Sequence, residues 1–151
     1  MKKLVYGVKV YECIGFLIFL HSVNLFYNME YQYHFEKLEV WNQSRQLVVA
    51  VYRLIKKFPP EEKFALCNQL RRSVISVPSN IAEGISRLAV KETIHFLEIA
   101  FGSLMEVYCQ LQIAVDLQYI TEKDFEEIKP LIISTSKLLN GLHKAKTKQI
   151  E

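Results

Sequence analysis

The chain has 151 residues, of which half are hydrophobic and 23% are charged, and its formal net charge is +3. This length supports one domain with a proper core, and the composition excludes an intrinsically disordered chain. Only 5 glycines and 4 prolines are present, which argues against a β-sandwich, a β-barrel or a glycine-rich phosphate-binding loop. Three widely spaced cysteines exclude a disulfide scaffold and predict a reducing, cytoplasmic location.

Residues 1–28 differ in character from the rest of the chain. Lysines precede an apolar core at residues 14–20, which is too short to span a membrane and is followed by a poor signal-peptide cleavage site. We favour a mis-called start, with translation beginning at Met29; the alternatives are a signal-like extension or anchor and a native N-terminal element. Without the three lysines and one glutamate of this segment the net charge falls from +3 to +1, so global charge gives little support to nucleic-acid binding.

Residues 29–151 are predicted to form one domain with four helices, because apolar residues recur there every three or four positions. The first helix runs from about residue 37 to residue 58. The second opens at Pro60, where proline suits a first helical turn. It continues through Pro78 with a kink, because the apolar phase carries on to Ile85.

The third helix spans about residues 89–117. The fourth opens at Thr121, with Asp124 completing an approximate capping box, and bends at Pro130. It is expected to end in a frayed basic tail made of Gly141 and the lysines Lys144, Lys146 and Lys148. Short connections between long helices force antiparallel neighbours. The predicted fold class is therefore all-α, an antiparallel up-down-up-down four-helix bundle.

The helices are more apolar than a monomer requires. Residues 47–51 place apolar side chains on every side of the first helix. The third helix carries further apolar residues outside its main stripe: Phe96, Ile99, Ala100, Met105 and Val107. A helix that is apolar on more than one face is buried on more than one side. We therefore expect self-association, against the alternative that small apolar residues are tolerated at a surface.

Catalytic and metal-binding patterns are incomplete. Glu92 and His95 have the Glu-x-x-His spacing of a di-iron ligand pair, but the second such pair is missing. The cysteines lack the spacing of zinc sites, and nothing brings a Ser/His/Asp triad together. We expect no enzymatic activity, no cofactor and no metal.

Basic and polar residues form the candidate sites. Arg71 and Arg72 are adjacent on the second helix, and Arg87 and Lys91 flank the turn into the third; each is a candidate for nucleic-acid phosphate or for an ion pair with a glutamate. A third basic group suits the negative end of the first helix dipole: Arg53, Lys56 and Lys57. Four polar residues on apolar faces are expected to form an interface or polar network: Asn80, Glu83, Glu98 and Glu106.

Two long strings of residues carry a family resemblance. Residues 69–84 read QLRRSVISVPSNIAEG and residues 96–106 read FLEIAFGSLME. With the opening at Phe35 and the junction at Phe58, the chain resembles the four-helix-bundle proteins encoded in intervening sequences of bacterial 23S rRNA genes. Their relatives include the accessory variability determinant of diversity-generating retroelements. The resemblance covers about residues 35–142.

The resemblance implies a ring-like homopentamer without established catalysis, and a basic face that binds nucleic acid, as in the retroelement relatives. Arg71 and Arg72 occupy the paired-arginine positions. Ala89 stands where Ser or Thr often caps the third helix, and Cys109 stands where Thr is common. The expected function is binding of structured RNA or DNA through repeated basic patches, with a protein-interaction scaffold as the alternative. Expected partners are further copies of the chain, RNA or DNA, and a reverse transcriptase or other protein, with no membrane for residues 29–151.

Overall fold

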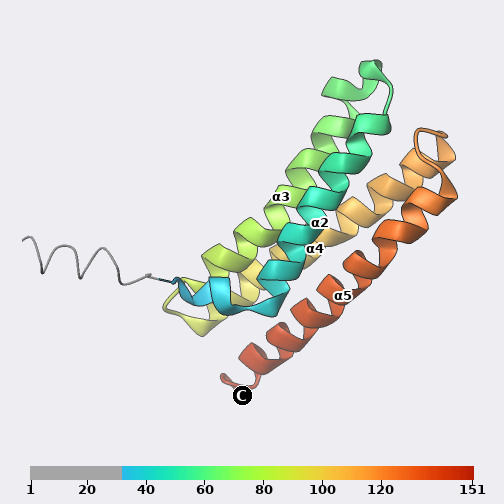
Figure 1. The fold of residues 1–151 in the computed structure, drawn as a ribbon. Coiled ribbons are helices and arrows are strands. Elements are labelled where there is room, and N and C mark those ends of the chain that lie inside the picture. The colour runs from blue at the N-terminus through green and yellow to red at the C-terminus, as the bar shows by residue number, and fades with distance from the viewer. Residues whose placement is uncertain (1–31) are drawn as a thin grey trace, which may run out of the picture. The chain divides into compact units, whose positions relative to one another are not determined.

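The computed structural model describes residues 32–151. These residues form four long helices and no strand: α2 (Glu39–Leu54), α3 (Leu66–Ile85), α4 (Val90–Asp116) and α5 (Glu122–Thr147) (Figure 1). Short 3-10 turns precede or extend them: η1 (His34–Lys37), η2 (Ile55–Lys57) and η3 (Pro60–Phe64). The prediction of an all-helical domain with four helices is confirmed. The expectations for residues 1–28 lie outside the described residues.

Each long helix packs against two others. α3 contacts α2 and α4, and α5 contacts α4 and α2. Residues of α3 meet those of α4 in reverse chain order, because Ser73 hydrogen-bonds to Gln110 whereas Gly84 lies against Phe96. Two side-chain pairs give the same reverse order between α2 and α5: Lys57 with Asp124, and Gln43 with Ser134.

The core lies between the four helices. The residues of α4 that face it differ from the apolar stripe that the sequence predicted. Ala100 and Val107 are fully buried, although the sequence pattern placed them outside the main stripe. Phe101 and Tyr108 are only partly buried beside the core. Because α4 lies between α3 and α5, its buried face is centred between these two neighbours. Of the apolar residues read as surplus, Ile99 and Met105 are exposed.

The start of α3 also differs from the prediction. The chain enters a 3-10 turn at Pro60, and the α-helix begins only at Leu66 after a break in helical geometry at Ala65 (φ −104°, ψ −109°). This shift in phase leaves the Phe64 side chain 82% exposed, whereas the sequence pattern placed it in the apolar stripe. The Glu62 carboxylate secures the junction by accepting a 3.0 Å hydrogen bond from the Leu66 amide.

α3 runs without interruption through Pro78, as predicted. Proline has no amide hydrogen to donate to the carbonyl of Val74 one turn earlier. The Asn80 side chain does not replace that bond. It donates instead to the carbonyl and the hydroxyl of Ser76, at 2.8 Å each. Asn80 therefore supports the helix at Ser76, two residues beyond the carbonyl that the proline leaves without its usual donor.

α5 begins as predicted, and Gly141 lies inside it. Thr121 is its N-cap and forms a capping box with Asp124. The helix continues through Pro130 and through Gly141 to Thr147. Gly141 does not have the positive φ that a terminating glycine adopts, so it takes no part in ending the helix, which ends instead among the predicted lysines, between Lys146 and Lys148. None of the helices in residues 32–151 has the length and apolar content that crossing a bilayer requires.

Candidate nucleic-acid interface

The four predicted phosphate contacts fall into two groups on the structure. Arg71 and Arg72 lie in the second turn of α3, whereas Arg87 follows α3 and Lys91 is in the first turn of α4. The helical rise between Arg72 and Arg87 is about 22 Å. The two groups therefore lie toward opposite ends of α3 and offer separate contacts to a ligand.

Arg87 is already engaged by carboxylates. Its guanidinium pairs with the Glu83 side chain one turn earlier and lies 4.0 Å from the Glu92 carboxylate. The same group stacks 4.8 Å from the centre of the Phe96 ring. Lys91 is exposed and forms no ion pair with the described residues. Arg87 thus has much of its charge compensated within the chain, and Lys91 does not.

Arg71 and Arg72 keep their charge uncompensated. Arg71 is half-buried, and its guanidinium donates a long 3.4 Å hydrogen bond to the Lys63 carbonyl. Arg72 is exposed, and within residues 32–151 neither arginine has a carboxylate partner. Glu98 and Glu106 are exposed as well, and Glu98 contacts His143 at 3.3 Å. Because both glutamates are exposed in the single chain, their carboxylates are not buried charges that require a cationic partner.

The polar network between α3 and α4 is made of hydroxyls and amides. Ser103 donates to the Ser76 hydroxyl at 2.9 Å, which Asn80 also contacts, and Ser73 donates to the Gln110 side chain at 2.9 Å. Sequence reasoning identified only Asn80 among these. The available signal was the recurrence of serine at helical spacing next to the apolar stripe of α3. These bonds satisfy buried polar groups where two helices approach closely.

Metal-binding geometry is not found in the part of the chain that the structure describes. Residues 32–151 contain no group of three or more His, Cys, Asp or Glu side chains placed to hold an ion. Glu92 faces Arg87, and the His95 ring lies 5.9 Å from the Phe96 ring. The free cysteines differ in exposure: Cys67 is buried and Cys109 is exposed. Burial raises the pKa of the Cys67 thiol, which favours the uncharged form.

The sequence profile of the 23S rRNA-intervening sequence protein family matches residues 36–141. The chain belongs to this family. A solved structure with 28% sequence identity has a TM-score of 0.64, and the match covers 70% of this chain and 98% of the other. That structure is a protein of unknown function from the S23 ribosomal protein family of Bacteroides thetaiotaomicron VPI-5482. The curated proteins include none that matches this chain.

The family match includes every predicted site residue, but much of its most distinctive string has a packing role. Within residues 69–84, Ser73 and Ser76 hydrogen-bond to α4, Asn80 bonds to Ser76 within α3, and Gly84 lies against Phe96 of α4. Arg71 and Arg72 lie in the same string without such a role, since neither contacts α4 through a hydrogen bond or an ion pair. The arginine pair is therefore a part of the string that contacts with α4 leave unexplained.

Proposed function

We propose that this protein is a non-enzymatic, homopentameric helical bundle of the cytoplasm that binds structured RNA or DNA through repeated basic patches. Its helices alternate up and down, which the reverse-order contacts of α3 with α4 and of α2 with α5 support. Its proposed relatives include the accessory variability determinant of retroelements, so a reverse transcriptase is a candidate partner. The family name links these proteins to 23S rRNA genes, and the solved relative is assigned to a ribosomal protein family.

The observation that carries the proposal is the presence of exposed or half-buried cations without carboxylate partners. Arg71, Arg72 and Lys91 have this character among the described residues. Free cations of this kind gain phosphate contacts without first breaking an ion pair. Arg87 contributes less, because two carboxylates already surround it. Residues 29–151 have a net charge near +1, so one subunit alone attracts nucleic acid weakly. The affinity for nucleic acid therefore rises most when several subunits present the same patch.

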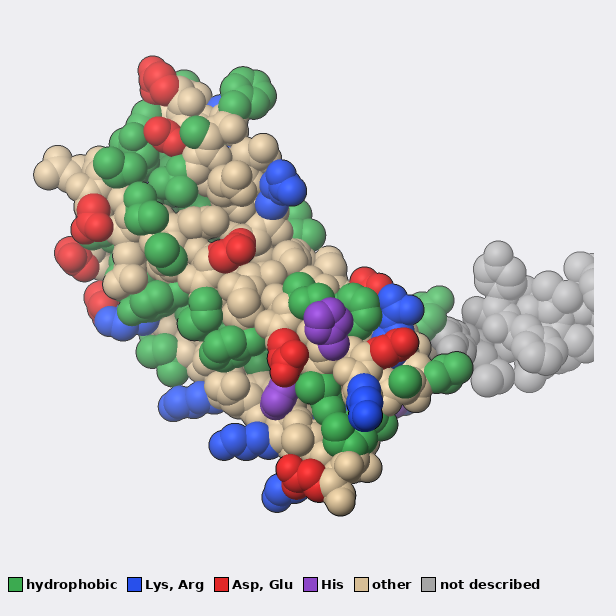
Figure 2. Space-filling view, turned by 180° about the vertical axis from the view of Figure 1, so that it is seen from behind, with side chains coloured by type: hydrophobic (Ala, Val, Ile, Leu, Met, Phe, Trp, Pro, Cys, Tyr) green, Lys and Arg blue, Asp and Glu red, His purple; other side chains and the backbone are tan. Residues whose placement is uncertain are grey.

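Self-association is supported by apolar side chains that one chain leaves exposed. Ile99, Met105 and Ile113 are exposed on the outer face of α4, and Gly102 lies between them with open space around it. Figure 2 shows the molecule from behind, where exposed apolar side chains lie among acidic, basic and polar ones. On α3, Ile75 is exposed as well. Exposed apolar side chains gathered on one helix face, here with Glu106 between Ile99 and Ile113, are typical of an interaction site.

Salt-dependent RNA binding by the full chain tests this function. Fluorescence anisotropy with a labelled RNA hairpin is expected to show binding that weakens linearly with the logarithm of salt concentration. The variant Arg71→Gln/Arg72→Gln is expected to bind more weakly, with a salt slope lower by about 1 for each phosphate that is no longer bound. A matched variant, Glu98→Gln/Glu106→Gln, is expected to bind at least as well as the parent. Absence of binding to any hairpin at low salt would contradict the proposal and favour a protein-interaction scaffold.

A further inference from the structure

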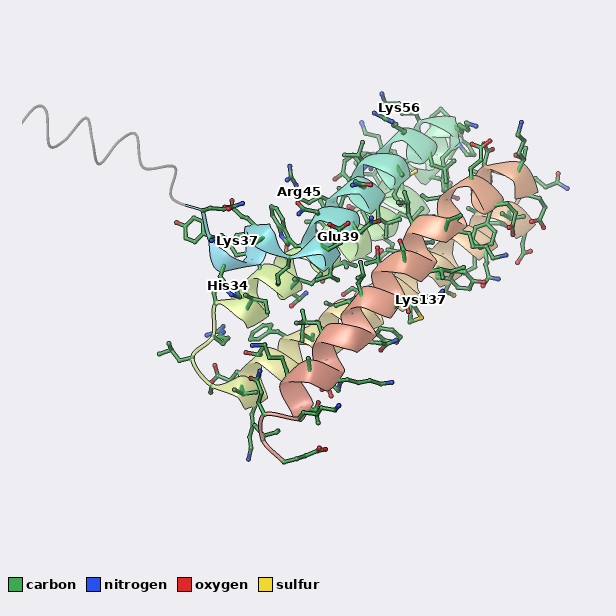
Figure 3. The ribbon with its side chains drawn as sticks, turned by 60° about the horizontal axis from the view of Figure 1, so that its bottom comes forward. His34, Lys37, Glu39, Arg45, Lys56 and Lys137 are labelled. Atoms are coloured by element: carbon green, nitrogen blue, oxygen red, sulfur yellow. The ribbon has the colours of Figure 1, made fainter. Side chains whose placement is uncertain are left out.

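The outer face of α2 carries a row of cations, only part of which the helix dipole accounts for. Arg45, Arg53 and Lys56 share one side of the helix with Val49 between them, and all four are exposed. No carboxylate lies on this stretch of the face, and none of the three cations forms an ion pair with the described residues. Figure 3 shows Arg45 on α2 and Lys56 on η2, the 3-10 turn that continues α2, projecting away from the other helices.

The neighbouring Lys57 shows that this exposure is specific to the outer face. Lys57 turns toward α5, where its ammonium lies 2.5 Å from the Asp124 carboxylate. At the C-terminal end of α2, the cation next to the helix dipole is therefore Lys57, and it is already paired with Asp124. Arg45 is held at the surface differently, with its guanidinium 4.8 Å from the centre of the Trp41 ring. That contact orients the group without neutralising its charge.

A groove runs along the same side of α2 toward α5. One hollow of about 800 Å³ is lined by Asn42, Arg45 and Gln46, and a second of about 280 Å³ by Lys57 on one wall and by the carboxylates Asp124 and Glu127 of α5 on the other. Both hollows are also lined by three shared residues, which makes them continuous: Ala50, Arg53 and Leu131. Glu39 is at the far end of the groove, where Gln43 donates a hydrogen bond to it. The α2 wall thus offers cations and amides, which are the side chains that contact phosphates and sugars.

The structure assigns to this outer face of α2, from Asn42 to Lys56, the binding of a nucleic-acid phosphodiester backbone. The inference rests on the proposed function and moves its main contact surface from α3 to α2. The rise from Arg45 to Lys56 is about 16 Å, which spaces the three cations widely enough for each to contact a separate phosphate. Recognition is of the backbone, because a helix face without base-reading side chains in a groove carries no sequence code.

An acidic protein segment is the competing ligand, and the face fits it less well. Protein interfaces are held by a few buried aromatic or aliphatic anchors with a polar rim. Here the exposed apolar residues Val49 and Tyr52 are three positions apart and flanked by cations. The apolar residues that line the adjacent groove, such as Leu54 and Ile128, are buried in the core of the domain itself. A row of cations with little apolar surface suits a nucleic-acid backbone, which carries one negative charge on each nucleotide.

The test compares Arg45→Gln/Arg53→Gln/Lys56→Gln with a control that removes the same charge elsewhere. The control is Lys123→Gln/Lys144→Gln/Lys148→Gln, which changes three exposed lysines on or beside α5 that form no ion pair with the described residues. Full-length proteins are titrated with RNA and DNA hairpins of the same sequence over a range of salt concentrations. Circular dichroism and light scattering verify that fold and assembly are unchanged, since all six side chains are exposed.

The α2 variant is expected to bind both hairpins about tenfold or more weakly, with a salt slope lower by about 3, while the control stays close to the parent. An α2 variant that binds like the parent would overturn this assignment and leave the proposed function standing. A parent that binds neither hairpin would overturn the proposed function and this inference with it. Equal affinity of the parent for poly-glutamate and for RNA would overturn the assignment in favour of an acidic protein.

Discussion

At the scale of single residues, Gly84 sets how closely α3 and α4 approach. A Cβ atom at this position would lie 2.8 Å from the Cβ of Phe96 and 3.2 Å from the Thr93 carbonyl oxygen. Neither atom is the flexible end of a side chain, so the backbones themselves have to separate to admit a methyl group. Gly141 is also helical, but a Cβ there would meet nothing within 4 Å. The two glycines therefore form a matched pair with opposite expected effects.

We expect Gly84→Ala to destabilise the protein by about 1–3 kcal/mol, because it overpacks a fixed contact. Gly141→Ala is expected to stabilise it by about 0.5–1 kcal/mol, because alanine loses less conformational freedom in a helix. Urea unfolding followed by circular dichroism measures both changes. Equal effects of the two substitutions would show that α3 and α4 are not in close contact at Gly84.

Gln118 is a second residue whose backbone geometry has a measurable cost. It has φ of 60° directly after α4, and its amide and that of Tyr119 bond back to the carbonyls of Val115 and Ala114. This is the Schellman arrangement, in which glycine is the usual residue. A non-glycine residue in the left-handed region costs about 1–2 kcal/mol.

Gln118→Gly is therefore expected to raise the free energy of unfolding by about 1 kcal/mol. The control is Gln112→Gly, at an exposed position inside α4, which is expected to lower it by about 1 kcal/mol. Thermal unfolding of the two variants beside the parent separates these signs. A loss of stability in both variants would mean that residue 118 does not hold the left-handed conformation in solution.

At the scale of helices, the sequence predicts elements well where apolar periodicity is strong. It predicted that α3 passes through Pro78, because the apolar phase at Ile81 belongs to the same stripe as that at Val74. It missed that Gly141 lies inside α5, because a glycine in the exposed face of a helix leaves the buried stripe unchanged, although it placed the end of the helix among the lysines that follow. The break at Ala65 was also missed, since the periodic pattern does not distinguish a 3-10 turn from the first turn of an α-helix.

The candidate site was less predictable than the helices. Sequence proximity suggested that Arg87 and Lys91 act together, yet Arg87 is paired with Glu83 one turn before it. Glu98 was expected to join an interface or polar network, and in the single chain it is exposed beside His143. Surface charges depend on which neighbouring helix lies beside them, and helical periodicity alone does not specify that. For this reason the unpaired cations were identifiable only from the folded chain.

The junction of α2 with α5 predicts a pH dependence of stability. Hydrogen bonds from Lys57, and then from the backbone and side chain of Thr121, lower the pKa of Asp124 from 3.8 to about 2. The folded-state pKa is below the unfolded value, so the contribution is complete above 3.8 and is lost as pH falls through about 2. This carboxylate both caps α5 and binds the end of α2, so its protonation weakens two elements together.

Asp124→Asn is expected to lower stability at neutral pH by about 1–2 kcal/mol, because it removes charge-assisted hydrogen bonds and half of the capping box. As pH falls from 3.8 to about 2, the parent is expected to lose stability faster than the variant, and the two curves converge. Urea titrations over this pH range provide the measurement. Glu126→Gln, which breaks an exposed ion pair with Lys129, serves as the control and is expected to change stability by less than about 1 kcal/mol. Parallel curves for the parent and Asp124→Asn would contradict this role.

At the scale of the whole molecule, the described domain has surfaces of two kinds. The outer side of α2 is cationic, and the outer side of α4 is largely apolar around Ile99 and Ile113, with Glu106 between them. These three positions of α4 recur every seven residues and so share one face. An assembly that buries the α4 face leaves the α2 faces of all its subunits available for nucleic acid. The proposed assembly and the proposed binding therefore use different helices and can be separated by mutation.

Ile99→Glu/Ile113→Glu is accordingly expected to reduce the parent assembly to smaller species, because it buries charge without a partner wherever α4 faces another subunit. Ile133→Glu replaces an equally exposed isoleucine on α5 and is expected to leave the assembly intact. Light scattering at micromolar concentration distinguishes these outcomes, and circular dichroism verifies the helices. A double variant with the mass of the parent would exclude the α4 face as the interface.

Each subunit carries its own α2 face, so the smaller species are expected to retain RNA binding. Their affinity for RNA is expected to be lower by about 100-fold or more, because avidity is lost. Unchanged RNA affinity in a dissociated variant would show that one subunit binds alone.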